Sequence, residues 1–492
     1  MAANAPLFLT LDVGTTAVKA GLFDETGRML ASSSREYTLE TPAQNVVELD
    51  AEVYWDTSVD ALTGVLRGQD KRAVASIGVC SQGETLICLD NAGVPLRKAI
   101  VWMDNRAQAE TEELRSRFGH LPETGQTDWD PSWPATKMLW LKRHEEEVFR
   151  RTSKYILVED FITYRLTGEF TGDYALYSSS YLLDIEKRSW VQPVLHELGV
   201  RQEQLVNLVD SGEVIGEVKP DVAGLIGVPE GTKVVSGAMD LAAALVGAGN
   251  IEPGQATEIT GAAEIMCNTL EALPERRLET IAVQRHARKD AFLSIGWCPA
   301  GGMSLRWFRD TFYENTSYDD LTAMAGDIQP GSDGLVFFPY QSGPGTLDLP
   351  QTVRGGWYGL ELNHSGGHFV RAIMEALGYV LRQNLEFMQV AGTAYEEIRS
   401  IGGGASSPVW NQIKADITGK RIVTTECAEA ASLGVAMLSA AALKVHTSLP
   451  DAASQMVREL DSVEPQESTR EQYEQEYRRY VELQRDMLSR LA

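Results

Sequence analysis

The chain has 492 residues, with 44 Lys and Arg against 69 Asp and Glu, so its formal charge is −25. This excess of acid repels polyanions, and no dense Lys/Arg block offsets it, which argues against a nucleic-acid-binding role. Hydrophobic residues make up 43% of the chain, enough for real cores, and the length predicts about two to four domains. No apolar run approaches the roughly 20 residues that span a bilayer, and the start lacks a secretory leader, so we predict a cytoplasmic protein without a membrane partner.

The first half mixes strands and helices. Two apolar runs between residues 7 and 30 flank the turn Asp12–Thr16 and predict a β-meander. Further elements are predicted from apolar runs and helical periodicity: strands at Val74–Val79, Thr85–Leu89 and Ile156–Val158, and helices at Ala107–Phe118 and Lys137–Arg151. This order favours an α/β fold.

The second half again opens with strands and closes with helices. Strands are predicted from Lys233, over Ala256–Gly261 and at the start of Ile398–Gly404, and helices over Leu305–Tyr313, Val370–Val390, Ser407–Thr418 and Ala430–Leu443. Pro253-Gly254 is the most plausible break, so we expect domains at 1–250 and 251–492. A terminal helix carries an apolar face that we expect to dock on the second domain: Tyr473, Tyr477, Tyr480, Met487 and Leu491.

The turn Asp12-Val-Gly-Thr-Thr16 lies between two predicted strands, with Lys19 in the second. A glycine beside hydroxyl residues at a tight hairpin presents N–H and O–H donors that can hold phosphate oxygens. An acid at the end of the first strand could hold Mg²⁺ through water. Taken alone the motif is weak, because Asp-x-Gly also occurs in ordinary turns.

Asp240 follows the apolar Val234-Val235 and heads a helix rich in small residues. An aspartate there could simply cap that helix. It could also accept the proton of a hydroxyl that attacks phosphorus. Farther on, Gly402-Gly-Gly404 lies between a predicted strand and helix. Three glycines suggest that something approaches the backbone closely, such as a nucleoside, although a tight strand–helix turn explains them equally well.

In chain order these three segments resemble the phosphate-1, phosphate-2 and adenosine elements of the sugar kinase, Hsp70 and actin superfamily. Two longer segments narrow the resemblance. Ser132-Trp-Pro-Ala-Thr-Lys-Met-Leu-Trp-Leu-Lys-Arg-His144 is similar to the first signature of the FGGY carbohydrate kinases. The stretch from Gly355-Gly-Trp-Tyr-Gly-Leu360 to Glu375 is similar to the second. The resemblance runs from about Leu7 to Leu443.

The resemblance implies two ribonuclease-H-like α/β domains, of the actin-like ATPase type, with the active site in the cleft between them. It implies Asp240 as the catalytic base and Asp12 near Mg²⁺. The residues implied for ATP are Gly14, Thr15, Thr16, Lys19, Thr260, Gly261, Gly302, Arg306, Gly403, Gly404 and Ala405.

The sugar side is implied less fully. Gln82-Gly-Glu84 stands where glycerol kinases carry Gln-Arg-Glu and xylulokinases carry Gln-Met-His, so it matches neither group throughout. Asp240 itself belongs to the sugar side, but the next residue is Leu241, where both groups usually carry Asn or Gln. Trp102, Asp104 and Arg106 resemble the family's Trp-x-Asp/Asn-x-Arg region, although a packed Trp and a structural ion pair explain them as well.

We therefore expect an ATP- and Mg²⁺-dependent kinase that phosphorylates a small sugar, with a ketopentose such as xylulose as the favoured substrate. The alternative is a glycerol, tetritol or pentitol kinase, prompted by Glu84 and by the room that Gly83 would leave. A sugar or nucleotide sensor without catalysis is the more remote hypothesis. Many members of the family are dimers, so the resemblance also allows a homodimer.

Overall fold

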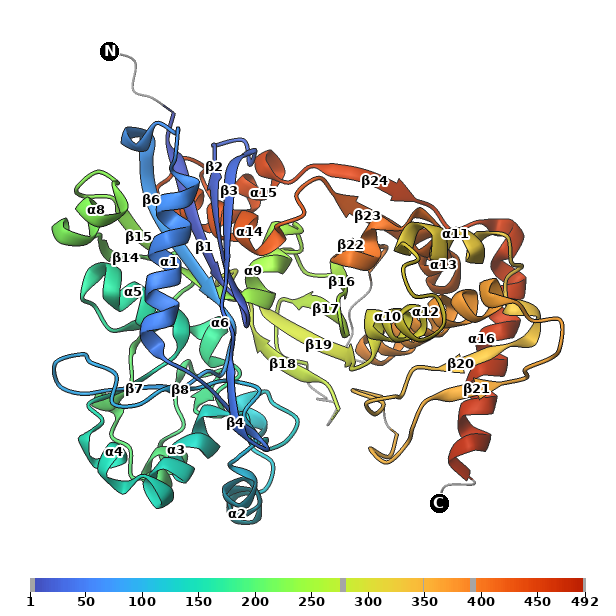
Figure 1. Ribbon diagram of the computed structural model, residues 1–492, viewed down its shortest axis with the longest axis horizontal. Coiled ribbons are helices and arrows are strands. Elements are labelled where there is room, and N and C mark those ends of the chain that lie inside the picture. Colours follow the sequence, from blue (N-terminus) through green and yellow to red (C-terminus); the bar gives the residue numbers. More distant parts are fainter. Residues whose placement is uncertain (1–4, 275–279, 348, 390–394, 490–492) are drawn as a thin grey trace. The chain divides into compact units, whose positions relative to one another are not determined.

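The computed structural model describes residues 5–274, 280–347, 349–389 and 395–489 (Figure 1). The chain forms two compact units. The first comprises Met1–Ile251, Val283–Phe292 and Glu429–Val457, and the second comprises Glu252–Ala282, Leu293–Ala428 and Arg458–Ala492. From the sequence we expected domains at 1–250 and 251–492, which would place Glu429–Val457 in the second domain. The contacts place this segment in the first unit instead.

The first unit is built on a six-stranded sheet of order β14-β15-β6-β1-β2-β3. Its strands are β1 (Leu7–Val13), β2 (Ala17–Phe23), β3 (Met29–Glu36), β6 (Val74–Ser81), β14 (Val214–Glu217) and β15 (Lys233–Met239). The expected meander is confirmed, because β1–β2 and β2–β3 are antiparallel hairpins. Both β1 and β15 pair with β6 in parallel, so the carboxyl ends of these three strands meet at one edge.

Helices pack on both faces of this sheet. On one face lie α1 (Ala51–Val65), which contacts β2 and β3, and α5 (Val158–Thr167), which contacts β6 and β15 (Figure 1). On the other lies α14 (Ala430–Ala442), which packs against β1, β6 and the helix α9 (Asp240–Gly247). This packing explains why a segment so late in the chain belongs to the first unit.

Small residues allow α9 and α14 to approach closely. A Cβ on Gly434 would lie 1.9 Å from the carbonyl oxygen of Ala243, and one on Gly247 would lie 1.8 Å from that of Ala430. Real Cβ atoms do not come this near to backbone, so the contact requires glycine on both helices.

We expect Gly434→Ala to destabilise the first unit by about 1–3 kcal/mol, because the added methyl group forces the two helices apart. Gly224→Ala in α8 (Pro220–Ile226) is the matched control, since no atom lies within 4 Å of its added Cβ. Urea unfolding monitored by circular dichroism measures both. Equal midpoints for the two variants would contradict the close contact.

Smaller elements surround the core of the first unit. They are β4 (Glu40–Ala43), β5 (Val46–Leu49), β7 (Ile87–Leu89), β8 (Ala99–Ile100), α2 (Gln108–Phe118), α3 (Pro134–His144), α4 (Glu146–Arg151), β9 (Lys154–Ile156), β10 (Thr171–Asp173), α6 (Tyr174–Tyr177), β11 (Leu183–Asp184), β12 (Ser189–Trp190), α7 (Gln192–Leu198), β13 (Asn207–Val209), β18 (Ala282–Arg285) and α15 (Leu449–Met456).

Two expected elements have different bounds here. The helix expected over Lys137–Arg151 is two helices that separate at Glu145, where acidic residues start α4 and favour a new N-terminus. The strand expected to reach Val158 ends at Ile156, because Asp160 accepts the N–H of Leu157 at 2.8 Å and so starts α5.

The second unit repeats the strand order of the first. Its strands are β16 (Ala256–Thr260), β17 (Glu264–Leu270), β19 (Phe292–Cys298), β22 (Glu397–Ile401), β23 (Arg421–Thr425) and β24 (Glu459–Val463). Their order is β19-β17-β16-β22-β23-β24, with β16–β22 and β22–β23 parallel and β23–β24 antiparallel. Each unit thus has the ribonuclease-H-like arrangement of a meander followed by parallel strands.

The core of the second unit surrounds the long helix α12 (Gly366–Gln389). The other elements here are α10 (Gly301–Phe312), α11 (Tyr318–Gly326), β20 (Val336–Phe338), β21 (Gly356–Tyr358), α13 (Pro408–Thr418) and α16 (Glu467–Ser489). The docked terminal helix is confirmed, since Tyr473 and Tyr480 of α16 are buried in this core. Val390 and Leu491 of the expected helices lie outside the described residues.

Candidate active site

The parallel strands of the first unit bring three acids to one edge of its sheet. Asp12 lies near the end of β1, Glu84 follows β6, and Asp240 follows β15 at the start of α9. The register pairs Val13 with Ser81, and Ser81 with Met239, so the three strand ends are level. Ligands of open α/β sheets bind at the carboxyl ends of parallel strands, which makes this edge a candidate site.

The acids at this edge have pKa values raised by burial. Burial raises the pKa of Asp240 to about 7, and the nearby charges of Asp12 and Glu84 add to the shift. Burial also raises the pKa of Asp12 to about 6, against the opposing effect of the Lys19 ammonium. A carboxylate with a pKa near neutrality is suited to accept a proton from a reacting hydroxyl.

The β1–β2 hairpin presents the residues expected to meet phosphate. Gly14 closes the turn by donating its N–H to the carbonyl of Ala17 at 3.0 Å, and it is followed by Thr15, which is partly exposed, and Thr16, which is exposed. Lys19 stands opposite Asp12 in the hairpin register, and its Nζ lies 2.8 Å from Oε2 of Glu429. Both side chains of this pair are solvent-accessible, so the ammonium can turn to an anion with little loss.

Gln82 and Gly83 follow β6 beneath this edge. The Gln82 amide donates to the hydroxyl of Tyr54 at 3.0 Å, while its Oε1 is buried with no hydrogen-bond partner among the residues that the structure describes. A Cβ on Gly83 would lie 3.1 Å from Sδ of Met239 and 3.2 Å from Oγ of Ser179. Met239 and Ser179 therefore border the position that a side chain at residue 83 would take.

Glu84 is held by a lysine that the sequence reasoning did not select. Lys137 of α3 is fully buried, and its Nζ donates to the carbonyls of Glu84 at 2.9 Å and Val101 at 3.1 Å. These bonds fix Glu84 in a left-handed backbone conformation, with φ 56°. Burial lowers the pKa of Lys137 to about 7 and raises that of the Glu84 carboxyl. A lysine inside an apolar helical segment was the available signal.

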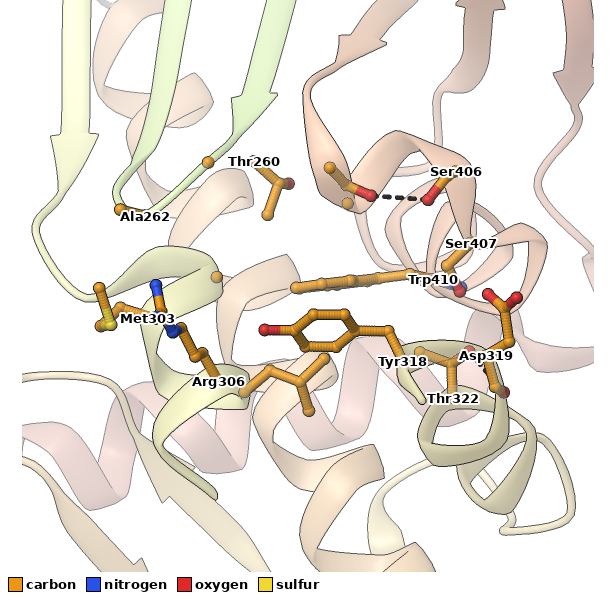
Figure 2. A pocket seen from close by; sticks show the side chains of 15 residues that line it. Thr260, Ala262, Met303, Arg306, Tyr318, Asp319, Thr322, Ser406, Ser407 and Trp410 are labelled. Carbon is orange, nitrogen blue, oxygen red and sulfur yellow. Dashed lines mark hydrogen bonds between the residues drawn. The ribbon is translucent and has the colours of Figure 1, made fainter. Parts of the chain in front are cut away.

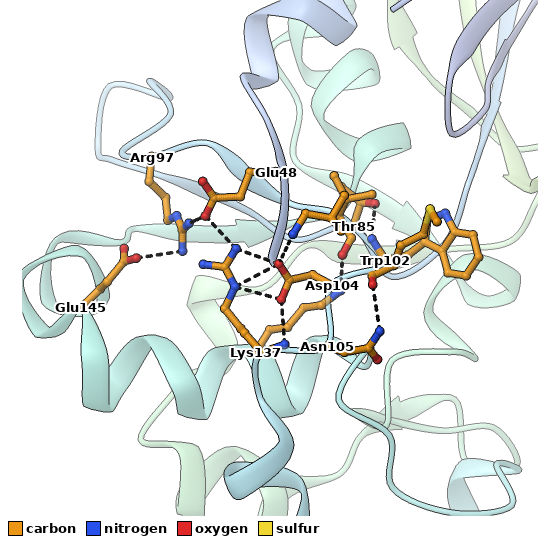
Figure 3. A network of polar contacts seen from close by, with 12 residues as sticks. Glu48, Thr85, Arg97, Trp102, Asp104, Asn105, Lys137 and Glu145 are labelled. Atoms are coloured by element: carbon orange, nitrogen blue, oxygen red, sulfur yellow. Dashed lines mark hydrogen bonds and ion pairs between the residues drawn. The ribbon is translucent and has the colours of Figure 1, made fainter. Parts of the chain in front are cut away.

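Trp102, Asp104 and Arg106 follow β8, and the structure separates their roles (Figure 3). Asp104 is fully buried, and its oxygens accept from the guanidinium of Arg106 and from the N–H of Val47 at 2.6 Å. Arg106 also contacts Glu48 at 2.7 Å. This is a structural ion pair with no free carboxylate oxygen for a sugar. Trp102, by contrast, is 38% exposed and donates its indole N–H to Thr15 Oγ1 at 3.0 Å.

The second unit contains a cavity of about 290 Å³ (Figure 2). It brings together most of the residues that the sequence assigned to ATP in this half. Those residues are Thr260, Gly261, Gly302, Arg306, Gly403 and Gly404. Ala405 is not among the lining residues; it lies in the short helical turn after Gly402, where its carbonyl accepts from Asn411 at 2.8 Å.

The glycine run packs against Thr260. A Cβ on Gly404 would lie 2.5 Å from Cβ of Thr260, and one on Gly402, whose φ is +83°, would lie 2.8 Å from the Thr260 carbonyl oxygen. Close backbone approach therefore explains these glycines, as we expected, but the approaching group is the chain itself. Gly302 likewise donates its N–H to the carbonyl of Gly261 at 3.0 Å. The turn at Thr260 and Gly261 and the glycine loop at Gly403 and Gly404 thus form two walls of the cavity.

Two aromatic residues of the cavity were missed by the sequence reasoning. Trp410 of α13 is almost fully buried, whereas Tyr318 of α11 is 42% exposed, and Figure 2 shows both rings in the middle of the cavity. Flat apolar walls of this kind suit a nucleobase, which stacks on aromatic faces. Neither residue was selected by a sequence motif, and only their proximity in the fold identifies them as cavity residues.

The duplicated ribonuclease-H-like fold, with acids at the strand ends of one unit and this cavity in the other, defines the class of actin-like phosphotransferases. Residues 7–247 match the N-terminal domain of the FGGY family of carbohydrate kinases, and residues 267–443 match its C-terminal domain. The chain belongs to this family and is a carbohydrate kinase.

Relatives of known name support the assignment. The xylulose kinase of Bacillus subtilis (strain 168) is 30% identical over 466 residues, which cover 94% of this chain and 93% of that one. The gluconokinase of the same organism is 28% identical and covers 94% and 93%. Among solved structures, the gluconate kinase from Lactobacillus acidophilus has a TM-score of 0.91 and 24% identity over 99% of this chain and 100% of that one, which supports the fold.

Proposed function

We propose that this kinase transfers the γ-phosphate of ATP to a hydroxyl of a ketopentose, with xylulose as the substrate. The observation that carries the proposal is Asp240, a carboxylate with a pKa of about 7 at the edge where the parallel strands end. The names of the relatives supply the sugar, since the B. subtilis xylulose kinase matches nearly the whole chain.

Asp240 is the proposed base. As the sugar oxygen attacks the γ-phosphorus, its proton passes to the Asp240 carboxylate, the new P–O bond forms, and the bond to the β-phosphate oxygen breaks to release ADP. The N–H of Leu241 donates to Asp240 Oδ1 at 2.6 Å and fixes the carboxylate at the head of α9. In this reading the second oxygen faces the sugar.

The nucleotide is proposed to bind in the cavity of the second unit. Tyr318 and Trp410 supply faces for the base, and Gly403 and Gly404 line the cavity where the ribose is proposed to bind. Arg306, whose side chain is exposed at the cavity, offers a cation for the phosphates. On the first unit, the hairpin donors and Lys19 are proposed to meet the transferred phosphate.

The donor set fits Mg²⁺ carried by the nucleotide. In the part of the chain that the structure describes, no cluster of three or more His, Cys, Asp or Glu could hold a metal ion by itself. Mg²⁺ is usually bound by one or two carboxylates together with phosphates and waters, and Asp12 supplies such a carboxylate. When bound, the ion would neutralise charge that develops on the phosphates.

Electrostatics distinguish the candidate sugars. Glu84 and Asp240 place two acids at the proposed sugar site, Asp12 lies at the same edge of the sheet, and burial raises the pKa of all three. Where these acids are ionised, they would repel an anionic sugar acid such as gluconate, whereas a neutral ketose would not be repelled. Gluconate is therefore the less favoured substrate, despite the similarity to gluconokinases. Polyols are neutral, so their exclusion rests on the relatives and needs the experiment below.

A coupled assay of ADP release across xylulose, other ketoses, aldoses, glycerol, pentitols and gluconate tests the proposal. We expect the highest kcat/KM with xylulose. Strong turnover of glycerol or gluconate alone would overturn the choice of sugar. Binding of ATP with no turnover on the whole panel would favour a sensor without catalysis.

The raised pKa of Asp240 predicts the pH dependence of the reaction. Only the deprotonated carboxylate can accept the proton. We therefore expect kcat/KM to fall as the pH drops below about 7, along an acid limb that corresponds to protonation of one group. Glu84→Gln removes a charge that raises this pKa, and should move the acid limb to lower pH. Glu230→Gln, at an exposed position of the same unit, is the control. If the acid limb of the pH profile does not move in Glu84→Gln, the charge of Glu84 does not raise the pKa of Asp240.

A further inference from the structure

A fully buried ion pair lies behind the turn that lines the cavity. The side chains of Lys414 on α13 and Glu258 on β16 are both 0% exposed, with Nζ 2.7 Å from Oε2. Withdrawing two charges from water carries a penalty of several kcal/mol per ion, and such pairs are often no more stable than apolar residues of similar volume. Stability alone therefore does not account for this pair.

The three N–H groups of Lys414 all have partners at this place. They reach Glu258, Thr260 Oγ1 at 2.9 Å and Ser400 Oγ at 3.3 Å. Thr260 in turn donates its hydroxyl to Glu258 Oε1, and Ser400 donates to Glu258 Oε2 at 2.6 Å. An ammonium can only donate and an ionised carboxylate can only accept, so these bonds fix the direction of every proton.

The Thr260 hydroxyl is therefore committed to the interior. Its single proton goes to Glu258 and one lone pair accepts from Lys414. It has no proton left to donate to a phosphate. Thr260 therefore affects the cavity through the placement of its main chain and Cβ, and not through its hydroxyl.

That position sets the spacing of two cavity walls. The main chain and Cβ of Thr260 pack against Gly402 and Gly404 closely enough that a Cβ on either glycine would overlap them. Gly261, the next residue, accepts the N–H of Gly302 at the start of α10. Movement of Thr260 would thus displace the glycine loop and the head of α10 together.

A neighbouring acid does not compete for the ammonium. Glu264 pairs with Thr260 in the β16–β17 register and is fully buried, and neither of its carboxyl oxygens has a partner in the described part of the chain. Burial, followed by the charge of Glu258, raises the pKa of Glu264 well above its ordinary value, against the opposing effect of the Lys414 ammonium, and so favours the uncharged form of this acid. Lys414 and Glu258 then balance one another.

We propose that Lys414 is a positioning residue for nucleotide binding: it holds Thr260 in place from behind and so fixes two walls of the cavity without touching the ligand. The inference rests on the proposed function, in which this cavity takes the nucleotide. It goes beyond that function by placing the control of nucleotide affinity in a buried ion pair.

The first test is Lys414→Met in the full-length protein, with ADP binding measured by calorimetry. We expect the Kd for ADP to rise at least tenfold. In the coupled assay the KM for ATP should rise similarly, while the KM for the sugar stays within twofold of the wild-type value. A merely structural role would not divide the two KM values in this way.

The double variant Glu258→Leu/Lys414→Met guards against misfolding, because it leaves no unpaired charge in the interior. We expect its unfolding temperature to recover toward that of the wild type, while ADP binding stays weak. Arg371→Met is the matched control. It breaks another buried pair of the second unit, with Arg371 Nε 2.8 Å from Glu375 Oε1, and neither residue lines the cavity. It should lower the unfolding temperature and leave the Kd for ADP unchanged.

The outcomes separate the two proposals. A folded Lys414→Met with the wild-type Kd for ADP would overturn the positioning role. Full recovery of ADP affinity in the double variant, or an equal loss in Arg371→Met, would do so too. A wild-type protein that binds ADP but phosphorylates no sugar would contradict the proposed function and leave the positioning role standing. A wild-type protein that binds no ADP would contradict both.

Discussion

Asp240→Asn is expected to lower kcat by about 10²–10⁴-fold, the range typical for loss of a general base. The amide has nearly the shape of the carboxylate and can still accept the N–H of Leu241, so the head of α9 should keep its structure. The Kd for ADP should stay within about twofold of the wild-type value, because the cavity proposed for the nucleotide belongs to the other unit. Stopped-flow kinetics and calorimetry measure the two effects.

The pH profile adds a second readout for Asp240. If this residue is the base, the residual activity of Asp240→Asn should lose the acid limb near pH 7 that the wild type shows. Asp104→Asn offers a contrast, since Asp104 lies in a buried structural ion pair of the same unit. That variant should lose stability and retain the limb. Near-normal turnover in Asp240→Asn would remove Asp240 from the mechanism.

Asp12→Asn is the second change expected to have a large effect. We expect turnover at saturating ATP to fall about 100-fold, which corresponds to about 2.7 kcal/mol of lost transition-state stabilisation. The Mg²⁺ concentration for half-maximal activity should rise, because the carboxylate proposed to orient the ion's waters is gone. Titration of activity with MgCl₂ at fixed ATP measures both quantities.

Asp24→Asn is the control for this variant. Asp24 lies after β2, and its Oδ1 accepts from Thr26 and Arg28, bonds that the asparagine oxygen can keep. It should show wild-type turnover and Mg²⁺ dependence. If Asp12→Asn also keeps the wild-type Mg²⁺ curve, the proposed contact of Asp12 with the ion is wrong, whatever the change in rate.

Local patterns predicted the elements on which the site is built. The two apolar runs that flank the Asp12 turn predicted the β-meander. The glycine run predicted a strand, a turn and a helix around Gly402. Asp240 was correctly expected at the head of a helix. These features depend on residues close together in the chain, where turn chemistry and periodicity decide the structure.

The features that escaped prediction depend on partners far away in the chain. Lys137 and Lys414 lie in helices, where a lysine ordinarily points to solvent, and only the tertiary fold supplies the acceptors that bury them. Tyr318 and Trp410 come from different helices and meet only in the cavity. The repeated strand order of the two units likewise has no visible repeat in the sequence.

The packing of α14 against the first unit has a consequence for the order of synthesis. Its residues, Ala430–Ala442, leave the ribosome long after β1 and β6, the strands that they cover. Until then, β1 and β6 lack the helix that covers them on this face, and a fragment ending near residue 250 would keep that part of the face exposed. We expect such a fragment to aggregate, and the nascent chain to complete its first unit only when translation is nearly finished.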